Sequence, residues 1–438
     1  MKYYLAIDIG ASSGRHIVGY MKDGELMTEE VYRFPNGMDT EDGHLVWDTD
    51  RLFREVKAGI AESIKRFGNI ESLSIDTWGV DYVLMKGDEE VKPTYAYRDA
   101  RVNEPIKLVH EIIPFSELYT RTGIQFNTFN TVYQLYADKI AGRLEGVTDF
   151  LMIPEYLMYK LTGVKKKEFT NATTAALINA DTLKLDSYIF EELGLPTALM
   201  GEIYAPGTLV GGFTPEVCAE VGGDIKVVLC ATHDTGSAVE AIDMNTDAPY
   251  VSSGTWSLLG VKTERAITDE KSRTSGYSNE GGVGYNRYQK NITGMWIIQS
   301  LRAEMCPDTS YSDIADMAKG SDFAEIFNVN DEAFLAPESM RGAIEKYLAD
   351  RGKPVPKSMA DYFNSAYVSL ADGYREAILD LENNTGKKYT EMYIVGGGAK
   401  NAYLNSLSEK ATGKRIIALP IEATAIGNIK VQMKINDK

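Results

Sequence analysis

Residues 4–19 of the chain read YLAIDIGASSGRHIVG, and residues 249–260 read PYVSSGTWSLLG. Each stretch combines an apolar strand, a turn of small Gly, Ser and Thr residues, and a second strand. Glycine lets backbone N–H groups approach phosphate oxygens, and serine and threonine hydroxyls add further donors. Two such hairpins about half a chain apart predict a duplicated nucleotide-binding fold of the α/β class, with one phosphate loop in each half.

The segments around the first hairpin follow a defined order. Residues 3–10, 15–21 and 25–32 have the apolar patterns of three consecutive strands, and residues 48–67 carry apolar side chains at helical spacing. Residues 72–76 are a candidate for a buried strand. This β-β-β-α-β order is typical of one half of an RNase-H-like layer.

The remainder of the chain is consistent with a second copy of this layer. We expect residues 100–225 to form a helical and irregular insertion that walls a cleft, and a second meander to begin at Ala248. Further expected elements are strands at residues 226–231 and 391–395 and helices at residues 297–304 and 359–382. The predicted lobes are residues 1–243 and 244–438, because Asn245 and Asp247 suggest a turn between them.

Composition excludes several functional classes. The 438 residues include 63 acidic and 46 basic side chains, a formal net charge of −17, so nucleic acid is not expected as a main partner. The three cysteines form no CxxC pair, which argues against a disulfide framework or zinc site and favours the reducing cytoplasm. Neither a signal-peptide core nor an apolar run of roughly 18 residues, the length of a membrane span, is present. HExxH and Walker P-loop patterns are also missing from the sequence.

The first hairpin carries candidate metal and phosphate ligands. Asp8 stands at the end of a strand, Ser12 and Ser13 lie in the turn, and Arg15 follows. A magnesium ion held through water by Asp8 would neutralise the β and γ phosphates of a nucleotide, while the serines and the turn amides hold the oxygens. Alternatively, the glycines only supply the positive φ of a tight hairpin.

A second candidate group is Thr232-His-Asp-Thr-Gly236, which follows a buried-type strand and opens a predicted helix. Asp234 could accept the proton of an attacking sugar hydroxyl there, or it could only cap the helix. His233 is either a ligand or a residue of the wall.

Glycine and tryptophan residues mark two further places. Gly396-Gly-Gly398 follows a predicted strand, so it is either a phosphate or nucleoside loop or a helix-entry turn. We expect Trp78, Trp256 and Trp296 in the core, although Trp78, beside Gly79, could face a sugar ring.

Eight blocks of the sequence, taken in order, resemble the FGGY carbohydrate kinases over nearly the whole chain. They are Asp8-Ile-Gly-Ala-Ser-Ser-Gly-Arg15, Asp76-Thr-Trp-Gly-Val-Asp81, Tyr97-Arg-Asp-Ala-Arg101, Thr232-His-Asp234, Ser252-Ser-Gly-Thr-Trp-Ser257, Lys290-Asn291, Gly396-Gly-Gly398 and Glu422-Ala-Thr-Ala-Ile-Gly-Asn428. The resemblance implies two actin-like (RNase-H-like) ATPase lobes, with ATP, Mg²⁺ and a sugar in the cleft between them. The sugar site and base would lie in residues 1–243 and the nucleotide site in residues 244–438.

The resemblance also implies roles for individual residues. Asp234 would be the catalytic base, Asp8 would serve the magnesium ion, and Thr255 would meet the γ-phosphate from the second lobe. Residues implied for the nucleotide are Ser12, Ser13, Arg15, Thr255, Asn291, Gln299, Gly398 and Asn401. Residues implied for the sugar are Gly79, Val80, Asp81, His233 and Asp234.

Within the family, the blocks are most similar to members that phosphorylate the 1-hydroxyl of L-rhamnulose. One departure is Tyr97, which stands where the family has tryptophan. Two alternatives stay open: a kinase for another ketose or polyol such as fuculose or xylulose, and a non-sugar ATPase module of the actin and chaperone type. The sequence leaves the oligomeric state open between monomer and homodimer.

Overall fold

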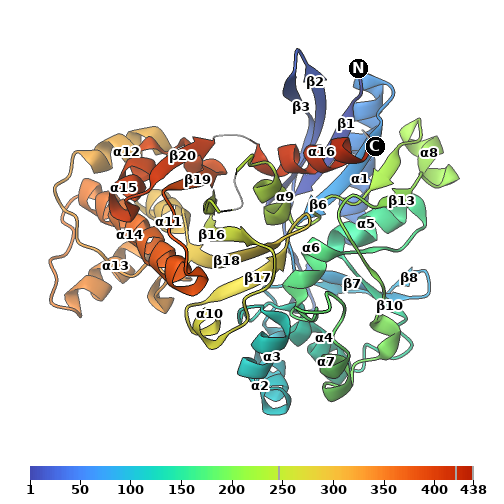
Figure 1. Ribbon diagram of the computed structural model, residues 1–438, viewed down its shortest axis with the longest axis horizontal. Helices are drawn as coiled ribbons and strands as arrows, with labels where there is room; N and C mark the ends of the chain where they lie inside the picture. Colours follow the sequence, from blue (N-terminus) through green and yellow to red (C-terminus); the bar gives the residue numbers. More distant parts are fainter. Residues whose placement is uncertain (245–246, 420–421, 437–438) are drawn as a thin grey trace.

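The computed structural model describes residues 1–244, 247–419 and 422–436, and it contains two lobes, each built around a six-stranded sheet (Figure 1). The first sheet runs β13 (Leu209–Gly211), β14 (Lys226–Val228), β6 (Ser72–Thr77), β1 (Tyr4–Ile9), β2 (Ser13–Lys22) and β3 (Glu25–Pro35). The second sheet runs β17 (Tyr277–Gly281), β18 (Asn286–Thr293), β16 (Trp256–Thr263), β15 (Tyr250–Ser253), β19 (Glu391–Val395) and β20 (Arg415–Leu419).

Helices and short strands surround both sheets. The helices of the first lobe are α1 (Thr49–Phe67), α2 (Asn103–Ile112), α3 (Phe115–Thr122), α4 (Thr131–Ile140), α5 (Ile153–Thr162), α6 (Phe169–Ala172), α7 (Ser187–Glu192), α8 (Pro215–Val221) and α9 (Asp234–Glu240). Its short strands are β4 (Asp39–Glu41), β5 (His44–Trp47), β7 (Tyr82–Lys86), β8 (Glu89–Glu90), β9 (Thr94–Tyr95), β10 (Asp149–Met152), β11 (Lys167–Glu168) and β12 (Ile203–Tyr204). The later helices are α10 (Glu270–Thr274), α11 (Trp296–Met305), α12 (Tyr311–Lys319), α13 (Met340–Ala349), α14 (Met359–Thr385), α15 (Ala402–Thr412) and α16 (Ala423–Asn436).

The predicted duplication of an α/β layer is confirmed. In the first sheet β1 pairs antiparallel with β2 and parallel with β6, and in the second β15 pairs antiparallel with β16 and parallel with β19. The second meander differs from the prediction, because β18 and not the earlier strand β17 pairs with β16. Strand β17 therefore lies at the edge of the second sheet.

Each lobe has its own apolar core. Helix α1 follows the N-cap Asp48, whose side chain accepts from the Arg51 N–H, and buries Leu52, Val56 and Ile60 against the first sheet. The second lobe is organised around the long helix α14, which packs against α11, α12 and α15. Burial of these faces provides the main stabilisation of both lobes.

The edge strand β17 joins the two lobes. The Tyr119 hydroxyl donates to the Tyr277 carbonyl at 2.7 Å, and the Gln125 N–H donates to the Ser278 hydroxyl at 2.8 Å. The Gly281 N–H donates to the Thr173 hydroxyl at 2.8 Å. The insertion of the first lobe is thus hydrogen-bonded along an edge strand of the second.

Helix α16 makes a second connection between the lobes. It follows β20 in the chain but packs against α9, β1 and β6 (Figure 1). Its buried Gln432 donates to the Leu5 carbonyl at 3.0 Å, and its buried Asn428 reaches β6. The boundary predicted between residues 243 and 244 borders residues 245–246, so the predicted turn residue Asn245 lies outside the described residues.

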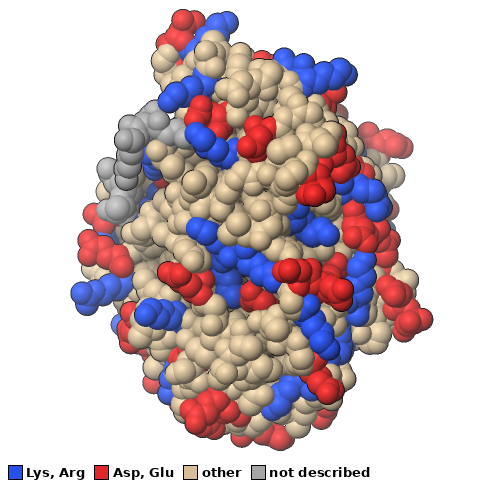
Figure 2. Space-filling view, turned by 90° about the vertical axis from the view of Figure 1, so that its right-hand side faces the viewer, with Lys and Arg blue, Asp and Glu red and all other residues tan. Residues whose placement is uncertain are grey.

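Charged side chains of both signs are interspersed over the outer face of the first lobe (Figure 2). Among the helices of the described residues, none combines the length and apolar character needed to cross a membrane.

Candidate active site

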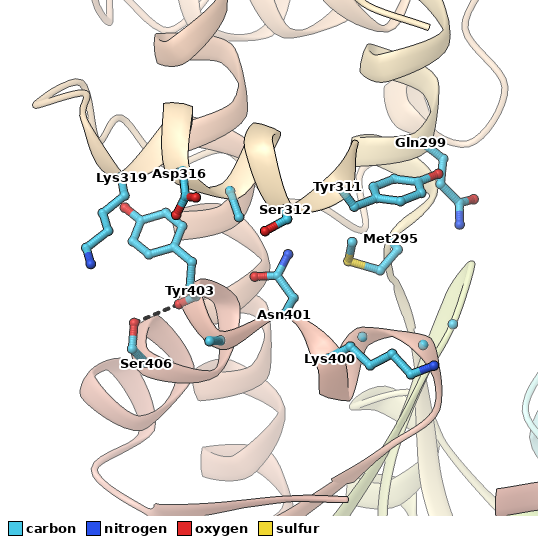
Figure 3. A pocket seen from close by; sticks show the side chains of 15 residues that line it. Met295, Gln299, Tyr311, Ser312, Asp316, Lys319, Lys400, Asn401, Tyr403 and Ser406 are labelled. Carbon is cyan, nitrogen blue, oxygen red and sulfur yellow. Dashed lines mark hydrogen bonds between the residues drawn. The ribbon is translucent and has the colours of Figure 1, made fainter. Parts of the chain in front are cut away.

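Two cavities flank the hairpin between β15 and β16. The larger, of about 640 Å³, lies wholly in the second lobe, between α11 and α12 on one side and the Gly396–Asn401 loop and α15 on the other (Figure 3). In Figure 3, Ser312 and Met295 face Asn401 across this space, and the Tyr311 ring points toward Gln299. The lining includes Gly254, Gln299, Gly398 and Asn401.

The glycine loop is held close to the hairpin. A Cβ at Gly398 would lie 2.0 Å from the Ser253 hydroxyl oxygen, and Gly396 adopts φ +83°. Only glycine fits these two backbone positions. Asn401 caps α15 by accepting from the Leu404 N–H at 2.9 Å and donates to the Tyr367 hydroxyl. The Thr255 hydroxyl donates to Gln299 at 3.3 Å. Gln299 lines the cavity with Gly398 and Asn401, so four residues expected at the nucleotide lie together.

The smaller cavity, of about 240 Å³, lies between the lobes. The first lobe contributes Trp78, Gly79, Val80, Tyr97, Ile124, Asn127, Phe129, Asn130, Thr174, His233, Asp234 and Thr235, and the second contributes Trp256, Leu258, Ser278, Glu280 and Asn291. Polar groups from several elements therefore converge on a space of the size of a small ligand.

Val80 holds an uncommon backbone conformation in this wall. Its φ is +69°, a region that β-branched residues rarely adopt and that costs about 1–3 kcal/mol. The surroundings stabilise it: the Val80 N–H donates to Thr174, and its carbonyl accepts from Thr131 at 2.7 Å and from Gln134. With this backbone conformation, Gly79 and Val80 form part of the cavity wall.

Asp81 is placed differently from the expectation that it faces a sugar. It is fully buried behind the wall, where its Oδ2 accepts from the indole N–H groups of Trp47 and Trp78 at 2.6 and 2.9 Å and from the Tyr97 N–H. Its Oδ1 accepts from Gln134. Burial raises the pKa of Asp81 to about 6, against the lowering effect of these bonds. Its observed contacts support the cavity wall.

Two residues of the second lobe also differ from expectation. Asn291, expected at the nucleotide, lines the smaller cavity, as Asp234 does. Trp256, expected in the core, is 42% exposed and lines the same cavity. Trp256 directly follows the turn at Gly254–Thr255, and its ring faces the smaller cavity between the lobes. Trp78 is buried and packs against Trp47, with ring centroids 4.2 Å apart, and it also borders the smaller cavity. Trp296 packs against the core of the second lobe.

Asp234 is the first residue of α9, and His233 is the N-cap. Capping of this helix is therefore not the role of Asp234. Its Oδ1 accepts from the Thr235 N–H at 2.5 Å and from the Thr235 hydroxyl at 3.0 Å, and it lies 3.5 Å from His233 Nε2. The carboxylate borders the smaller cavity and remains about one-third exposed.

The first hairpin lies outside the walls of these two cavities. Gly10 N–H donates to the Ser13 carbonyl at 2.9 Å, and the Asn36 N–H donates to the Ser12 carbonyl at 3.0 Å, so the turn is well fixed. Arg15 donates from Nε and Nη2 to Asp8 Oδ2 at 3.0 and 2.9 Å. Its Nη1 donates to Glu422, which stands just before α16.

Asp76 lies next to Asp8 on the neighbouring strand β6. It is fully buried, its Oδ2 accepts from Asn428 at 2.5 Å, and its Oδ1 has no partner in the described part of the chain. Burial and the charge of Asp8 raise the pKa of Asp76 well above its ordinary value. Burial also raises the pKa of Asp8, although Arg15 acts in the opposite direction.

These features fit a magnesium ion that arrives with a nucleotide. Two adjacent buried carboxylates with an unpaired oxygen favour a nearby cation. Within residues 1–244, 247–419 and 422–436, no group of three or more His, Cys, Asp or Glu residues is arranged to hold a metal. Phosphate oxygens and waters would therefore supply most of the ligands, as is usual for magnesium.

Sequence reasoning missed several residues around Asp234, the candidate base. The buried Glu168 carboxylate accepts from the Thr232 N–H and hydroxyl at 3.1 and 2.6 Å, and Thr170 accepts from the His233 N–H at 3.2 Å. Glu280 and Arg287 of the second lobe reach His233. These residues reach the site through tertiary contacts, and no motif in the sequence marks them.

Family models match both lobes. The model described as the N-terminal domain of the FGGY family of carbohydrate kinases matches residues 3–239, and the model of its C-terminal domain matches residues 249–434. The rhamnulokinase of Oceanobacillus iheyensis is 42% identical, over 99% of this chain and 93% of its own length. The rhamnulokinase of Halalkalibacterium halodurans is 41% identical over the same shares of the two chains.

Solved structures share the fold at low sequence identity. A ligand-bound xylulose kinase from Lactobacillus acidophilus gives a TM-score of 0.82 at 16% identity, over 100% of this chain and 90% of that chain. The glycerol kinase of Plasmodium falciparum with ADP gives 0.80 at 15% identity, over 100% and 90%.

Proposed function

The chain belongs to the FGGY family of carbohydrate kinases, and we propose that it transfers the γ-phosphoryl group of ATP to the 1-hydroxyl of L-rhamnulose. The products are ADP and L-rhamnulose 1-phosphate. Support for this substrate comes from the rhamnulokinases that are 41–42% identical over nearly the full chain. The free cysteines Cys218, Cys230 and Cys306 agree with a cytoplasmic site of reaction.

The observation that carries this proposal is the hairpin shared by the two cavities. Gly254 lines the larger cavity and Trp256 lines the smaller, with Thr255 between them. A nucleotide in the larger cavity that extends its phosphates along this turn would bring the γ-phosphoryl group toward Asp234. Phosphoryl transfer depends mainly on such positioning and on neutralisation of charge.

The nucleotide is assigned to the second lobe and the first hairpin. Gln299, Gly398 and Asn401 would hold the nucleoside and α-phosphate, and Thr255 would contact the γ-phosphate. Ser12, Ser13 and Arg15 would contact phosphate oxygens from the other side. Magnesium, held through Asp8, supplies neutralisation of the phosphate charge when it is bound.

The sugar is assigned to the smaller cavity. Gly79, Val80, His233 and Asn291 would contact its hydroxyls, since they line the space together. Asp234 would accept the proton of the 1-hydroxyl as the new O–P bond forms. That proton leaves late, as bonding to phosphorus develops, so the reaction does not need a strong base.

The test is ADP release measured with L-rhamnulose, L-fuculose, D-xylulose and glycerol. We expect L-rhamnulose to exceed D-xylulose and glycerol in kcat/KM by at least about tenfold, because a wrongly placed hydroxyl leaves a buried polar group unpaired at about 1–3 kcal/mol. A higher kcat/KM with any other sugar would contradict the assignment of L-rhamnulose. ADP release at the same rate without sugar would contradict kinase activity itself.

A further inference from the structure

Arg287 on β18 is a fully buried cation of the second lobe that reaches the base of the first. Its Nη2 lies 3.0 Å from His233 Nδ1 and 3.0 Å from Glu280 Oε2, and its Nε donates to the Gly281 carbonyl at 2.8 Å. These contacts fix the guanidinium between β17 and the turn before α9. Arg287 is not among the residues that line either cavity.

The contact with Arg287 favours one of the two neutral forms of His233. A guanidinium donates hydrogen bonds and accepts none, so Nδ1 of His233 accepts wherever Arg287 bonds to it. In a neutral imidazole the proton then resides on Nε2. Nε2 lies 3.5 Å from Asp234 Oδ1, so a proton on this nitrogen is close to the carboxylate.

With this proton on Nε2, the two carboxylate oxygens of Asp234 have different surroundings. Oδ1 faces the Thr235 N–H, the Thr235 hydroxyl and the His233 ring, whereas Oδ2 has no hydrogen bond within the described residues. A carboxylate with one oxygen held by donors keeps the other free to accept a proton.

We propose that Arg287 is a positioning residue, which selects the Nε2–H tautomer of His233 and so orients Asp234 with Oδ2 toward the sugar hydroxyl. The second lobe then helps to set the geometry of the base in the first. This inference rests on the proposed function for the role of Asp234, but the tautomer itself can be measured without turnover.

Glu280 is the competing partner of the same ring. Its Oε2 lies 3.1 Å from His233 Nδ1 and would favour a proton on that nitrogen. Burial alone would raise the pKa of Glu280, but the charge of Arg287 acts in the opposite direction, and that pKa lies below its ordinary value. Glu280 is therefore anionic near neutral pH and balances the buried charge of Arg287.

Nitrogen-15 NMR of the imidazole rings tests the tautomer directly. The chain has four histidines, and comparison with His233→Gln identifies the His233 signals. At about pH 8, we expect protonated Nε2 and unprotonated Nδ1 in the wild type. A proton on Nδ1, or on both nitrogens, would overturn the proposal.

Two variants separate the roles of Arg287 and Glu280. Arg287→Met should shift His233 toward the Nδ1–H form and lower kcat at least about tenfold, with little change in the KM for ATP. Glu280→Gln should leave the Nε2–H form in place because Arg287 is still present. A switch to Nδ1–H in Glu280→Gln would overturn the proposal, and this variant decides the matter if Arg287→Met does not fold.

Failure of the proposed function has a different signature. A wild-type protein that releases no ADP with any sugar of the panel, yet shows the Nε2–H tautomer, would refute the kinase assignment and leave the tautomer intact. A sugar kinase with the Nδ1–H tautomer would refute only the inference on Arg287.

Discussion

A Cβ atom at Gly427 of α16 would lie 1.7 Å from the carbonyl oxygen of Ser237 in α9. The two helices therefore cross with their backbones in contact, which no residue other than glycine permits at position 427. Because α9 begins at Asp234, the helix that follows β20 supports the helix that carries the proposed base.

Gly427→Ala should force α9 and α16 apart. Overpacking of this kind typically costs about 1–3 kcal/mol, and displacement of Asp234 should lower kcat as well. Gly37→Ala is a suitable control, since a Cβ there meets nothing within 4 Å. Urea unfolding midpoints and kcat of the two variants give the comparison, and equal values for both would contradict the close crossing.

Asp234→Asn should keep the fold and the affinity for ATP but lower kcat by about two orders of magnitude or more, as expected when a general base is removed. The matched control is Asp322→Asn at an exposed position outside both cavities. Steady-state kinetics together with ATP titration by calorimetry make the measurement. Near-normal turnover in Asp234→Asn would rule out Asp234 as the base.

Trp256→Ala should weaken sugar binding more than nucleotide binding. The exposed indole forms part of the smaller cavity, where an aromatic face can pack against the apolar side of a sugar ring. We expect the KM for L-rhamnulose to rise about tenfold, corresponding to about 1.4 kcal/mol, with the KM for ATP nearly unchanged. Trp256→Phe should recover part of the loss, and an increase confined to the KM for ATP would contradict the assignment.

The lowered pKa of Glu382 leads us to expect a loss of folding stability at acid pH. Burial would raise its pKa, but bonds from Lys388 and Lys414 at 2.6 Å and from the Tyr389 N–H lower it to about 2. A lowered carboxyl pKa gives stability that is fully present above the ordinary value of 4.5 and is lost as the pH falls toward 2.

Glu382→Gln should therefore be less stable than the wild type near pH 7, by on the order of 2 kcal/mol, and the difference should shrink below about pH 4. Glu376→Gln, on the same helix but 58% exposed, serves as the control with little effect. Urea unfolding at several pH values measures both variants. A difference for Glu382→Gln that stays constant down to pH 3 would contradict the lowered pKa.

The main architecture could be predicted because it follows from local patterns. Small-residue turns between apolar strands identified both hairpins, and helical spacing identified α1 and α14, whose bounds differ by only a few residues from the predicted ones. The pairing of β18 with β16 could not be predicted, since it depends on contacts between segments that have equally strand-like patterns.

The direction in which each side chain points was the feature of the site that could least be predicted from the sequence. Asn291 and its neighbour Lys290 alternate across β18, so the face that each one occupies depends on strand register rather than composition. Asp81 and Gly79 are close in sequence, but the positive φ of Val80 sends the former behind the wall while the latter lines the cavity. Glu168 and Arg287 act through tertiary contacts, and no motif marks them.

Phosphorus-31 NMR of the product tests the central proposal most directly. With ATP, Mg²⁺ and ¹³C-labelled L-rhamnulose, we expect one phosphate monoester for each ADP formed, with its phosphorus coupled to C1 of the sugar. The Asp234→Asn variant should form the same product at least about a hundredfold more slowly. Formation of inorganic phosphate alone, or of an ester at a hydroxyl other than that of C1, would contradict the proposed reaction.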